Sequence, residues 1–162
     1  VYGKSKDLGE YYLKKFSKNF NIVRTTIVGL NVFKKNESFV EWIINSNLKK
    51  QKINLFNDVK FNPISIWDFS KEIKFIIDNN INEKILHISG SEICSKYEFG
   101  IQIIRSLNLN LDYVSEGAIE NNNKRFKRSL DQSINCKFYQ KKYNRLLPTV
   151  KQTVNQIKLN YI

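Results

Sequence analysis

The 162-residue sequence is poor in several residue types, and each scarcity excludes a class of protein. It contains only two prolines and six glycines, which excludes collagen-like and low-complexity chains. No run of about 18 apolar residues occurs, so we expect no membrane partner. Cys94 and Cys136 do not have the spacing of a metal site or the number that a disulfide framework needs. Without a recognisable signal sequence, these features indicate a reduced, cytoplasmic, globular protein without a metal.

Arginine is scarce in a strongly basic chain. The net charge is +12, yet only five of the 27 basic residues are arginines. Lysine, asparagine and isoleucine are abundant while alanine occurs once, a composition that codons rich in A and T produce. The lysine doublets are spread along the chain. A nucleic-acid interface needs positive charge concentrated on one face and arginines that contact phosphates and base edges. We therefore expect no nucleic-acid partner.

The spacing of apolar residues predicts alternating helices and strands. Helical spacing predicts helices over residues 2–18, 39–48, 68–79, 95–107 and after Pro148. Apolar, β-branched runs predict strands over 22–28, 53–56, 63–66, 85–89 and 111–114, with a polar surface loop over 116–128. This alternation favours an α/β fold with a parallel sheet. The glycine-rich loop that begins a dinucleotide-binding domain is absent, so the chain is either not such a domain or lacks its first half.

Tyr2 and Lys6 are the first candidates for chemistry. Residues four positions apart on a helix share a face, so the ammonium of Lys6 can favour the phenolate of Tyr2. A tyrosine whose pKa is lowered from about 10 can donate a proton near neutral pH, as carbonyl reduction requires. Tyr11 and Lys15 have the same spacing, and eight tyrosines with 22 lysines produce about one such pair by chance. Spacing alone does not separate the two pairs.

A series of short segments in a fixed order separates them. These are residues 1–10 (VYGKSKDLGE), 22–29 (IVRTTIVG), 38–40 (SFV), Asp58 with Pro63 and Asp68, 86–90 (LHISG), 95–100 (SKYEFG) and 125–131 (RFKRSLD). In this order they resemble segments of the extended short-chain dehydrogenases/reductases, most closely the dTDP-4-dehydrorhamnose reductase branch. The sequence departs from that branch where Val59 and Phe61 replace a glutamine and a glycine, and where the proline after Arg125 is missing.

The resemblance implies the fold and its division. It implies an α/β chain that forms the C-terminal part of an NAD(P)-binding Rossmann-like fold with a small α/β substrate-binding lobe. Residues 1–29 and 85–90 would belong to the Rossmann sheet and the catalytic helix, and residues 30–84 and 91–162 mostly to the substrate-binding lobe and packing helices. The N-terminal cofactor-binding half would be absent, so we expect the isolated chain to be inactive.

The resemblance also implies the site residues of a reductase of nucleotide-linked 4-keto sugars. Tyr2 would protonate the sugar C4 oxygen, and Lys6 would hold the nicotinamide ribose of NADPH or NADH and assist Tyr2. A second set, at the end of a strand, would border the nicotinamide: Thr25, Thr26 and Ile27. The arginines of a late segment would pair with the diphosphate of the sugar nucleotide: Arg125 or Arg128.

Other interpretations remain open from the sequence. A sugar-nucleotide epimerase or dehydratase of the same superfamily shares these motifs, and so does a non-catalytic binding or regulatory relative. The implied partners are a nucleotide sugar and a second copy of the chain in a homodimer. We expect Arg24 to anchor its strand through an ion pair with a carboxylate. Asp58 is expected in a turn and Asp68 at a helix N-cap.

Overall fold

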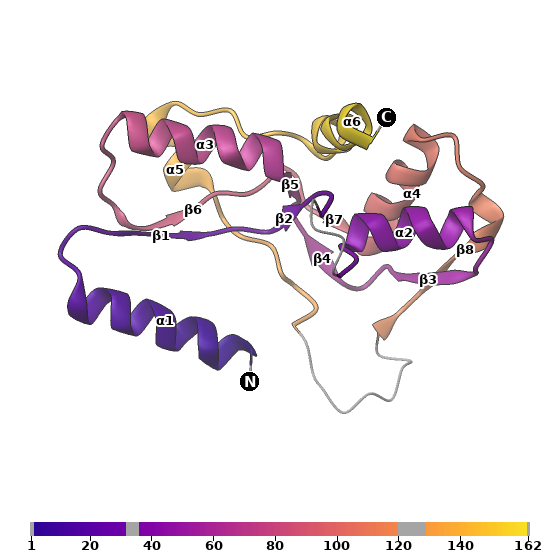
Figure 1. Ribbon diagram of the computed structural model, residues 1–162, viewed down its shortest axis with the longest axis horizontal. Helices are drawn as coiled ribbons and strands as arrows, with labels where there is room; N and C mark the ends of the chain where they lie inside the picture. Colours follow the sequence, from indigo (N-terminus) through magenta and orange to yellow (C-terminus); the bar gives the residue numbers. More distant parts are fainter. Residues whose placement is uncertain (1, 32–35, 120–128, 162) are drawn as a thin grey trace.

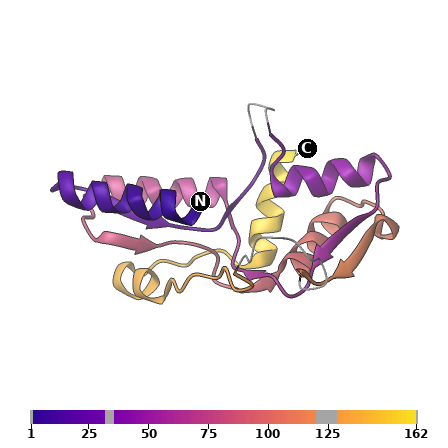
Figure 2. The same cartoon turned by 90° about the horizontal axis from the view of Figure 1, so that it is seen from below.

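The computed structural model describes residues 2–31, 36–119 and 129–161, and at Tyr2 only the main chain. Figure 1 shows an elongated molecule with an α/β part at each end and short strands at its centre. Helix α6 (Val150–Tyr161) lies between the two parts, as Figure 2 also shows from below. Of the described helices, none has both the length and the apolar character needed to cross a membrane.

The first part is an open α/β unit. Its elements are α1 (Tyr2–Phe16), β1 (Asn21–Arg24), α3 (Ile66–Asp78), β6 (Lys84–His87) and α5 (Lys137–Tyr143). The strands β1 and β6 are parallel. Helices α1 and α3 lie on opposite sides of this strand pair, and α5 packs against β6 (Figure 1).

The second part has its own pair of parallel strands, β3 and β8. Its elements are α2 (Phe39–Leu48), β3 (Ile53–Phe56), α4 (Lys96–Ser106), the 3-10 helix η1 (Leu111–Tyr113) and β8 (Val114–Gly117). Two short strand pairs lie between the parts: β2 (Ile27–Val28) with β5 (Ile64–Ser65), parallel, and β4 (Lys60–Phe61) with β7 (Cys94–Ser95), antiparallel.

Each part has its own apolar core. The larger cluster is buried among α2, β3, α4 and α6: Val28, Val40, Ile43, Ile44, Ile53, Leu55, Phe61, Cys94, Phe99, Ile103, Ile104, Val150, Val154 and Ile157. The smaller cluster joins β5, α3, β6 and α5: Ile64, Ile76, Leu86, Ile88, Cys136, Tyr139 and Leu147. The chain crosses from one cluster to the other between Phe61 and Ile64.

Local capping explains where the helices begin. Ser38 and Ser95 each form a capping box with the glutamate three residues later, so α2 and α4 begin where the sequence predicts. The prediction for Asp68 is wrong. The N-cap of α3 is Ser65, whose hydroxyl accepts a hydrogen bond from the Asp68 amide at 3.0 Å and donates to its carboxylate at 2.7 Å. An acidic residue inside the first turn stabilises the positive end of the helix.

The structure differs from the predicted elements where tertiary contacts decide. The strand expected over 22–28 is two strands, because β1 and β2 pair with different partners. The strand expected over 111–114 is η1 followed by β8, which extends to Gly117 into the expected loop. Residues 120–128 of that loop lie outside the described residues. Helix α5 was not predicted, because it has no capping side chain and only seven residues.

A buried ionic network joins α3 to α5. The Glu72 carboxylate, 7% exposed, accepts two hydrogen bonds from the Arg145 guanidinium, at 3.0 and 2.8 Å. It also accepts one from the Tyr139 hydroxyl at 2.7 Å. The guanidinium lies over the Phe75 ring, 4.3 Å from its centroid. Because Glu72 is shielded from water, its charge depends on these partners.

We expect Arg145→Met to lower the free energy of unfolding by about 2 to 3 kcal/mol, because it leaves the Glu72 charge buried with one neutral partner. Urea unfolding of the protein measures this change. The matched control is Lys74→Met, which removes an exposed helix pair with Asp78 and should cost less than about 0.5 kcal/mol. Equal losses in the two variants would contradict the role given to the network.

Candidate active site

Thr25 and Thr26 lie at the carboxyl end of β1, where the chain passes from one strand pair to another. β1 ends at Arg24 beside β6, and β2 begins at Ile27 beside β5. Ligands of open α/β sheets bind at the carboxyl ends of the strands, where neighbouring strands diverge. The end of β1 is therefore the candidate site.

A set of hydrogen bonds around Asn62, which we name the Asn62 knot, holds this end of the sheet together. The Asn62 carbonyl accepts hydrogen bonds from the hydroxyls of Thr26 and Ser89 and, at 3.1 Å, from the Gly90 amide. The Asn62 side chain donates to the carbonyls of Gly90 and Ile134 and accepts from the Ile134 amide, each at 2.9 Å. Asn62 is only 4% exposed, so water does not compete for these bonds. The Thr26 hydroxyl is thus occupied by protein contacts.

The Thr25 hydroxyl is in the opposite situation. Its Oγ1 is buried and has no hydrogen-bond partner among the described residues. A buried hydroxyl without a partner costs about 1 to 3 kcal/mol. The residue as a whole is half-buried, so rotation about its Cα–Cβ bond exchanges the hidden hydroxyl with the methyl group. Of the two threonines, Thr25 is the one whose hydroxyl can serve a polar ligand.

An ion pair fixes helix α1 against β1. The Arg24 guanidinium donates two hydrogen bonds to the Glu10 carboxylate, at 2.8 Å from Nε and 2.7 Å from Nη2. These bonds hold the pKa of Glu10 below its ordinary value. Arg24 therefore makes the ion pair predicted for it. Helix α1 runs antiparallel to β1 in Figure 1, so its N-terminal end lies toward the carboxyl end of the strand.

Tyr2 and Lys6 lie on the N-terminal half of α1, toward the candidate site. Lys6 is one helical turn before Glu10 and has an exposed side chain, and Tyr2 begins the helix. The side chain of Tyr2 lies outside the described part of the chain, so its pairing with Lys6 stays a prediction. Tyr11 and Lys15, in contrast, form an exposed pair: Lys15 Nζ lies 5.8 Å from the ring centroid of Tyr11, which is 53% exposed.

The remaining predicted site residues have different outcomes. Ile27 begins β2 next to the two threonines and is 43% exposed, which leaves it able to border a ligand. Arg125 and Arg128 both lie outside the described residues. Their proposed contact with a diphosphate stays a prediction.

The described ends of the segment between residues 119 and 130 are tied to one short stretch of chain. The Ile119 amide donates to both carboxylate oxygens of Asp58, at 3.0 and 2.9 Å. Two residues later, the Lys60 amide donates to the Leu130 carbonyl at 2.7 Å and the Lys60 carbonyl accepts from the Gln132 amide at 2.8 Å. Asp58, expected only to form a turn, therefore also anchors the beginning of this segment.

No sequence pattern indicates the Asn62 knot. Asparagine and serine are mostly exposed in folded proteins, so a sequence pattern does not distinguish a buried Asn62 or Ser89 from a surface residue. The neighbouring Pro63 belongs to a segment that carries the family resemblance, but that segment assigns Asn62 no role. The knot exists only in the folded chain, because its hydrogen bonds join residues 27 to 72 positions apart in the sequence.

Comparison with known proteins identifies a family over nearly the whole chain. A family model described as the RmlD substrate binding domain matches residues 1–161. The spore coat polysaccharide biosynthesis protein SpsK of Bacillus subtilis is 30% identical over 124 residues, which cover 76% of this chain and 42% of SpsK.

Solved structures show the same fold. A dTDP-4-dehydrorhamnose reductase of Bacillus anthracis in complex with NADP has a TM-score of 0.86 at 21% identity, covering 98% of this chain and 55% of its own. One from Clostridium acetobutylicum also has a TM-score of 0.86, at 23% identity, covering 99% and 56%. A dTDP-glucose 4,6-dehydratase of Bacillus anthracis in complex with NAD has a TM-score of 0.71 at 14% identity, covering 96% and 49%. The predicted α/β, Rossmann-like fold is confirmed, and the chain spans about half the length of these relatives.

We expect a double-mutant cycle with Glu10→Gln and Arg24→Leu to give a coupling free energy of about 1 kcal/mol at pH 7. The pKa of the Glu10 carboxyl is lowered from 4.5 in the folded protein, so the stabilisation is complete above 4.5 and is lost as the pH falls below it. Urea unfolding of the four proteins at about pH 7 and at about pH 3.5 measures the coupling. A coupling that does not weaken in acid would show that the ion pair does not hold α1.

Proposed function

Because this chain belongs to the RmlD substrate-binding-domain family, we propose that it is part of an NAD(P)H-dependent reductase of nucleotide-linked 4-keto sugars. The names of its relatives support this substrate class, since two of the structures are dTDP-4-dehydrorhamnose reductases and SpsK takes part in polysaccharide biosynthesis. The product would then be a precursor of a surface polysaccharide. The observation that carries the proposal is the Glu10–Arg24 ion pair, which holds the helix of Tyr2 and Lys6 against β1.

In the proposed mechanism Tyr2 is the proton donor. Its hydroxyl gives a proton to the C4 oxygen of the keto sugar, and the ammonium of Lys6 stabilises the phenolate that remains. Lys6 would also hold the ribose next to the nicotinamide through a hydrogen bond from its ammonium group. The exposed side chain of Lys6, one turn from the anchored Glu10, is compatible with both contacts. This proton transfer would accompany hydride addition at C4, so that the carbonyl becomes a hydroxyl without a free alkoxide.

The cofactor is NADPH or NADH, and the end of β1 fits its nicotinamide end. Thr25 offers a buried hydroxyl without a partner in the described structure, which a ribose hydroxyl or the carboxamide of the nicotinamide can pair with. Ile27 offers an exposed apolar surface against the flat ring. Thr26 lines the site but keeps its hydroxyl in the Asn62 knot. When bound, the reduced nicotinamide supplies the hydride.

The diphosphate of the sugar nucleotide would be bound by Arg125 and Arg128. A guanidinium forms two parallel hydrogen bonds with phosphate oxygens, which suits this residue type. Asp58 and Lys60 support the assignment indirectly, because they tie both ends of the segment that carries the two arginines to the same stretch of chain.

An epimerase or dehydratase of the same fold is the second candidate, and the dehydratase of Bacillus anthracis is the observation that keeps it open. We favour reduction because residues 1–10 and 22–29 resemble the reductase branch most closely, whereas a shared fold does not separate the two activities. The two activities differ in one measurable respect. A reductase consumes one NAD(P)H for each sugar, whereas an epimerase or dehydratase returns the hydride and consumes none.

Two further properties belong to the proposal. We place the protein in the cytoplasm, where the buried thiols of Cys94 and Cys136, which form no disulfide, would stay reduced.

We also propose a homodimer. The outer surface of α1 supports it, because it exposes large apolar side chains that a second copy could cover: Leu8, Tyr11, Tyr12, Leu13 and Phe16.

Replacement of the proton donor tests the proposed reaction. In the full-length protein, Tyr2→Phe should lower kcat for NAD(P)H-dependent reduction of a dTDP-4-keto sugar by about 100-fold or more, because the alkoxide then has no proton source. The absorbance of NADPH at saturating substrate measures the rate. The matched control is Tyr161→Phe, which removes the same hydroxyl from an exposed tyrosine at the end of α6 and should leave kcat unchanged. Turnover retained in Tyr2→Phe would refute the mechanism.

The arginines predict a separate effect on substrate binding. We expect Arg125→Ala with Arg128→Ala to raise the KM of the sugar nucleotide about tenfold or more, because two charge-assisted contacts to the diphosphate are lost. Asp58→Ala should raise KM in the same direction, and Asp58→Asn less, since the amide oxygen still accepts from Ile119. Arg105→Ala is the control, because Arg105 is exposed on α4. An unchanged KM in the double variant would remove both arginines from the site.

A further inference from the structure

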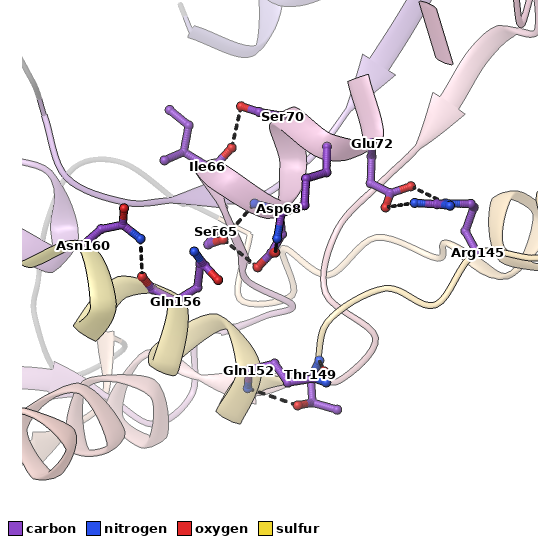
Figure 3. A network of polar contacts seen from close by, with 11 residues as sticks. Ser65, Ile66, Asp68, Ser70, Glu72, Arg145, Thr149, Gln152, Gln156 and Asn160 are labelled. Carbon is purple, nitrogen blue, oxygen red and sulfur yellow. Dashed lines mark hydrogen bonds and ion pairs between the residues drawn. The ribbon is translucent and has the colours of Figure 1, made fainter. Parts of the chain in front are cut away.

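A cavity lies on the side of the β1–β6 pair opposite to α1. Its lining residues come from α3, from α6 and from the chain between Arg145 and Pro148 that leads into α6. Figure 3 shows the two helices and Arg145 from close by. Its volume is about 450 Å³, which falls in the range of small-molecule sites. None of its lining residues takes part in the proposed reduction. Its lining combines charged, amide and apolar side chains: Asp68, Lys71, Glu72, Arg145, Leu146, Pro148, Gln152, Asn155, Gln156 and Leu159.

The charges in the wall of this cavity are already compensated. Lys71 pairs with Asp68 at 2.9 Å, and the Ser65 hydroxyl donates to the other oxygen of the same carboxylate. Arg145 pairs with Glu72 at 2.8 Å. Two positive and two negative side chains therefore leave the wall without net charge. A charged ligand would meet one like charge for each opposite charge, so the wall favours a neutral one.

The side chains with unused hydrogen-bonding capacity are neutral carboxamides on α6. The amides of Asn155 and Gln156 have no side-chain hydrogen bond in the described structure, and Gln156 is directed toward Asp68 across the cavity (Figure 3). Gln152 accepts from the Thr149 amide at 2.8 Å, which leaves its two N–H donors free. Because these residues are three and four positions apart on one helix, they face the same space. Each carboxamide can both donate and accept.

Two leucines at the rim add an apolar surface. Leu146 is 94% exposed and Leu159 is 74% exposed, and both line the cavity. A neutral molecule with many hydroxyl groups and an apolar C–H face would use every part of this wall. We propose that the cavity between α3 and α6 binds a neutral pyranose sugar, with its hydroxyls on Asn155, Gln156 and Gln152 and its C–H face on the leucines. This site does not depend on the proposed reduction.

Ligand-observed NMR titration of the full-length protein tests this site, with methyl β-D-glucopyranoside and methyl α-L-rhamnopyranoside as probes. We expect saturable binding of at least one, in the range of about 1 to 10 mM, because few hydrogen bonds are available. Gln156→Leu and Asn155→Leu should each weaken that binding about fivefold or more, and they disturb no internal side-chain bond. The control Asn160→Leu removes a carboxamide from the same helix outside the cavity and should have no effect.

Further probes define the ligand. D-glucuronate should bind about fivefold more weakly than the neutral glycosides, because the wall has no net charge. Maltotriose that binds about tenfold more tightly than a single sugar would identify a glycan chain as the source of the ligand, and equal affinity would identify a free sugar. The absence of saturable binding up to about 50 mM of both glycosides would overturn the site. Unchanged glycoside binding in both Gln156→Leu and Asn155→Leu would also overturn it. So would binding of the neutral peptide N-acetyl-alanine-amide that is tighter than binding of the glycosides.

Discussion

The Asn62 knot holds the molecule together at the point where its two apolar cores meet. Phe61 belongs to the core under α2 and α4, and Ile64 belongs to the core of α3 and α5, so only Asn62 and Pro63 separate them. A buried asparagine between two apolar clusters must find all its partners in the protein, since leaving a buried polar group without a partner costs more than a net hydrogen bond contributes. Glycine is required at position 90 for a steric reason, because a Cβ there would lie 2.2 Å from the Pro63 carbonyl oxygen. The knot thereby fixes where β1 ends and where the next strand pair begins.

The candidate site follows from that fixed end. The knot occupies the hydroxyl of Thr26 and leaves the hydroxyl of Thr25 without a partner, so two adjacent threonines acquire different roles. The Glu10–Arg24 ion pair then holds the helix of Lys6 beside the same strand end. One buried polar cluster and one partly exposed ion pair thus bring together segments that are far apart in the sequence. The family to which the chain belongs gives this arrangement its proposed chemistry.

The sequence predicts what short-range interactions determine. Helix α2 and strand β3 have the predicted bounds, because Ser38 and Glu41 form a local capping box and the strand is a single apolar run. The break of the 22–28 run and the existence of α5 were not predictable, since each depends on partners about 40 to 70 residues away. In the site, the motif around Lys6 was recognisable, whereas the difference between the two threonines required the position of Asn62. The Tyr2 side chain and the late arginines stay predictions.

We propose that this chain supplies the proton donor of a sugar-nucleotide reductase, and this role can be tested by where the hydride goes. Its most direct test is isotope transfer in the full-length protein, with NADPH deuterated at the transferable position of the nicotinamide and a dTDP-4-keto sugar as substrate. We expect one deuterium at C4 of the product sugar, detected by NMR, with one NADPH consumed for each sugar. A product without deuterium at C4, or an epimerised or dehydrated sugar formed with no net consumption of NADPH, would contradict this role.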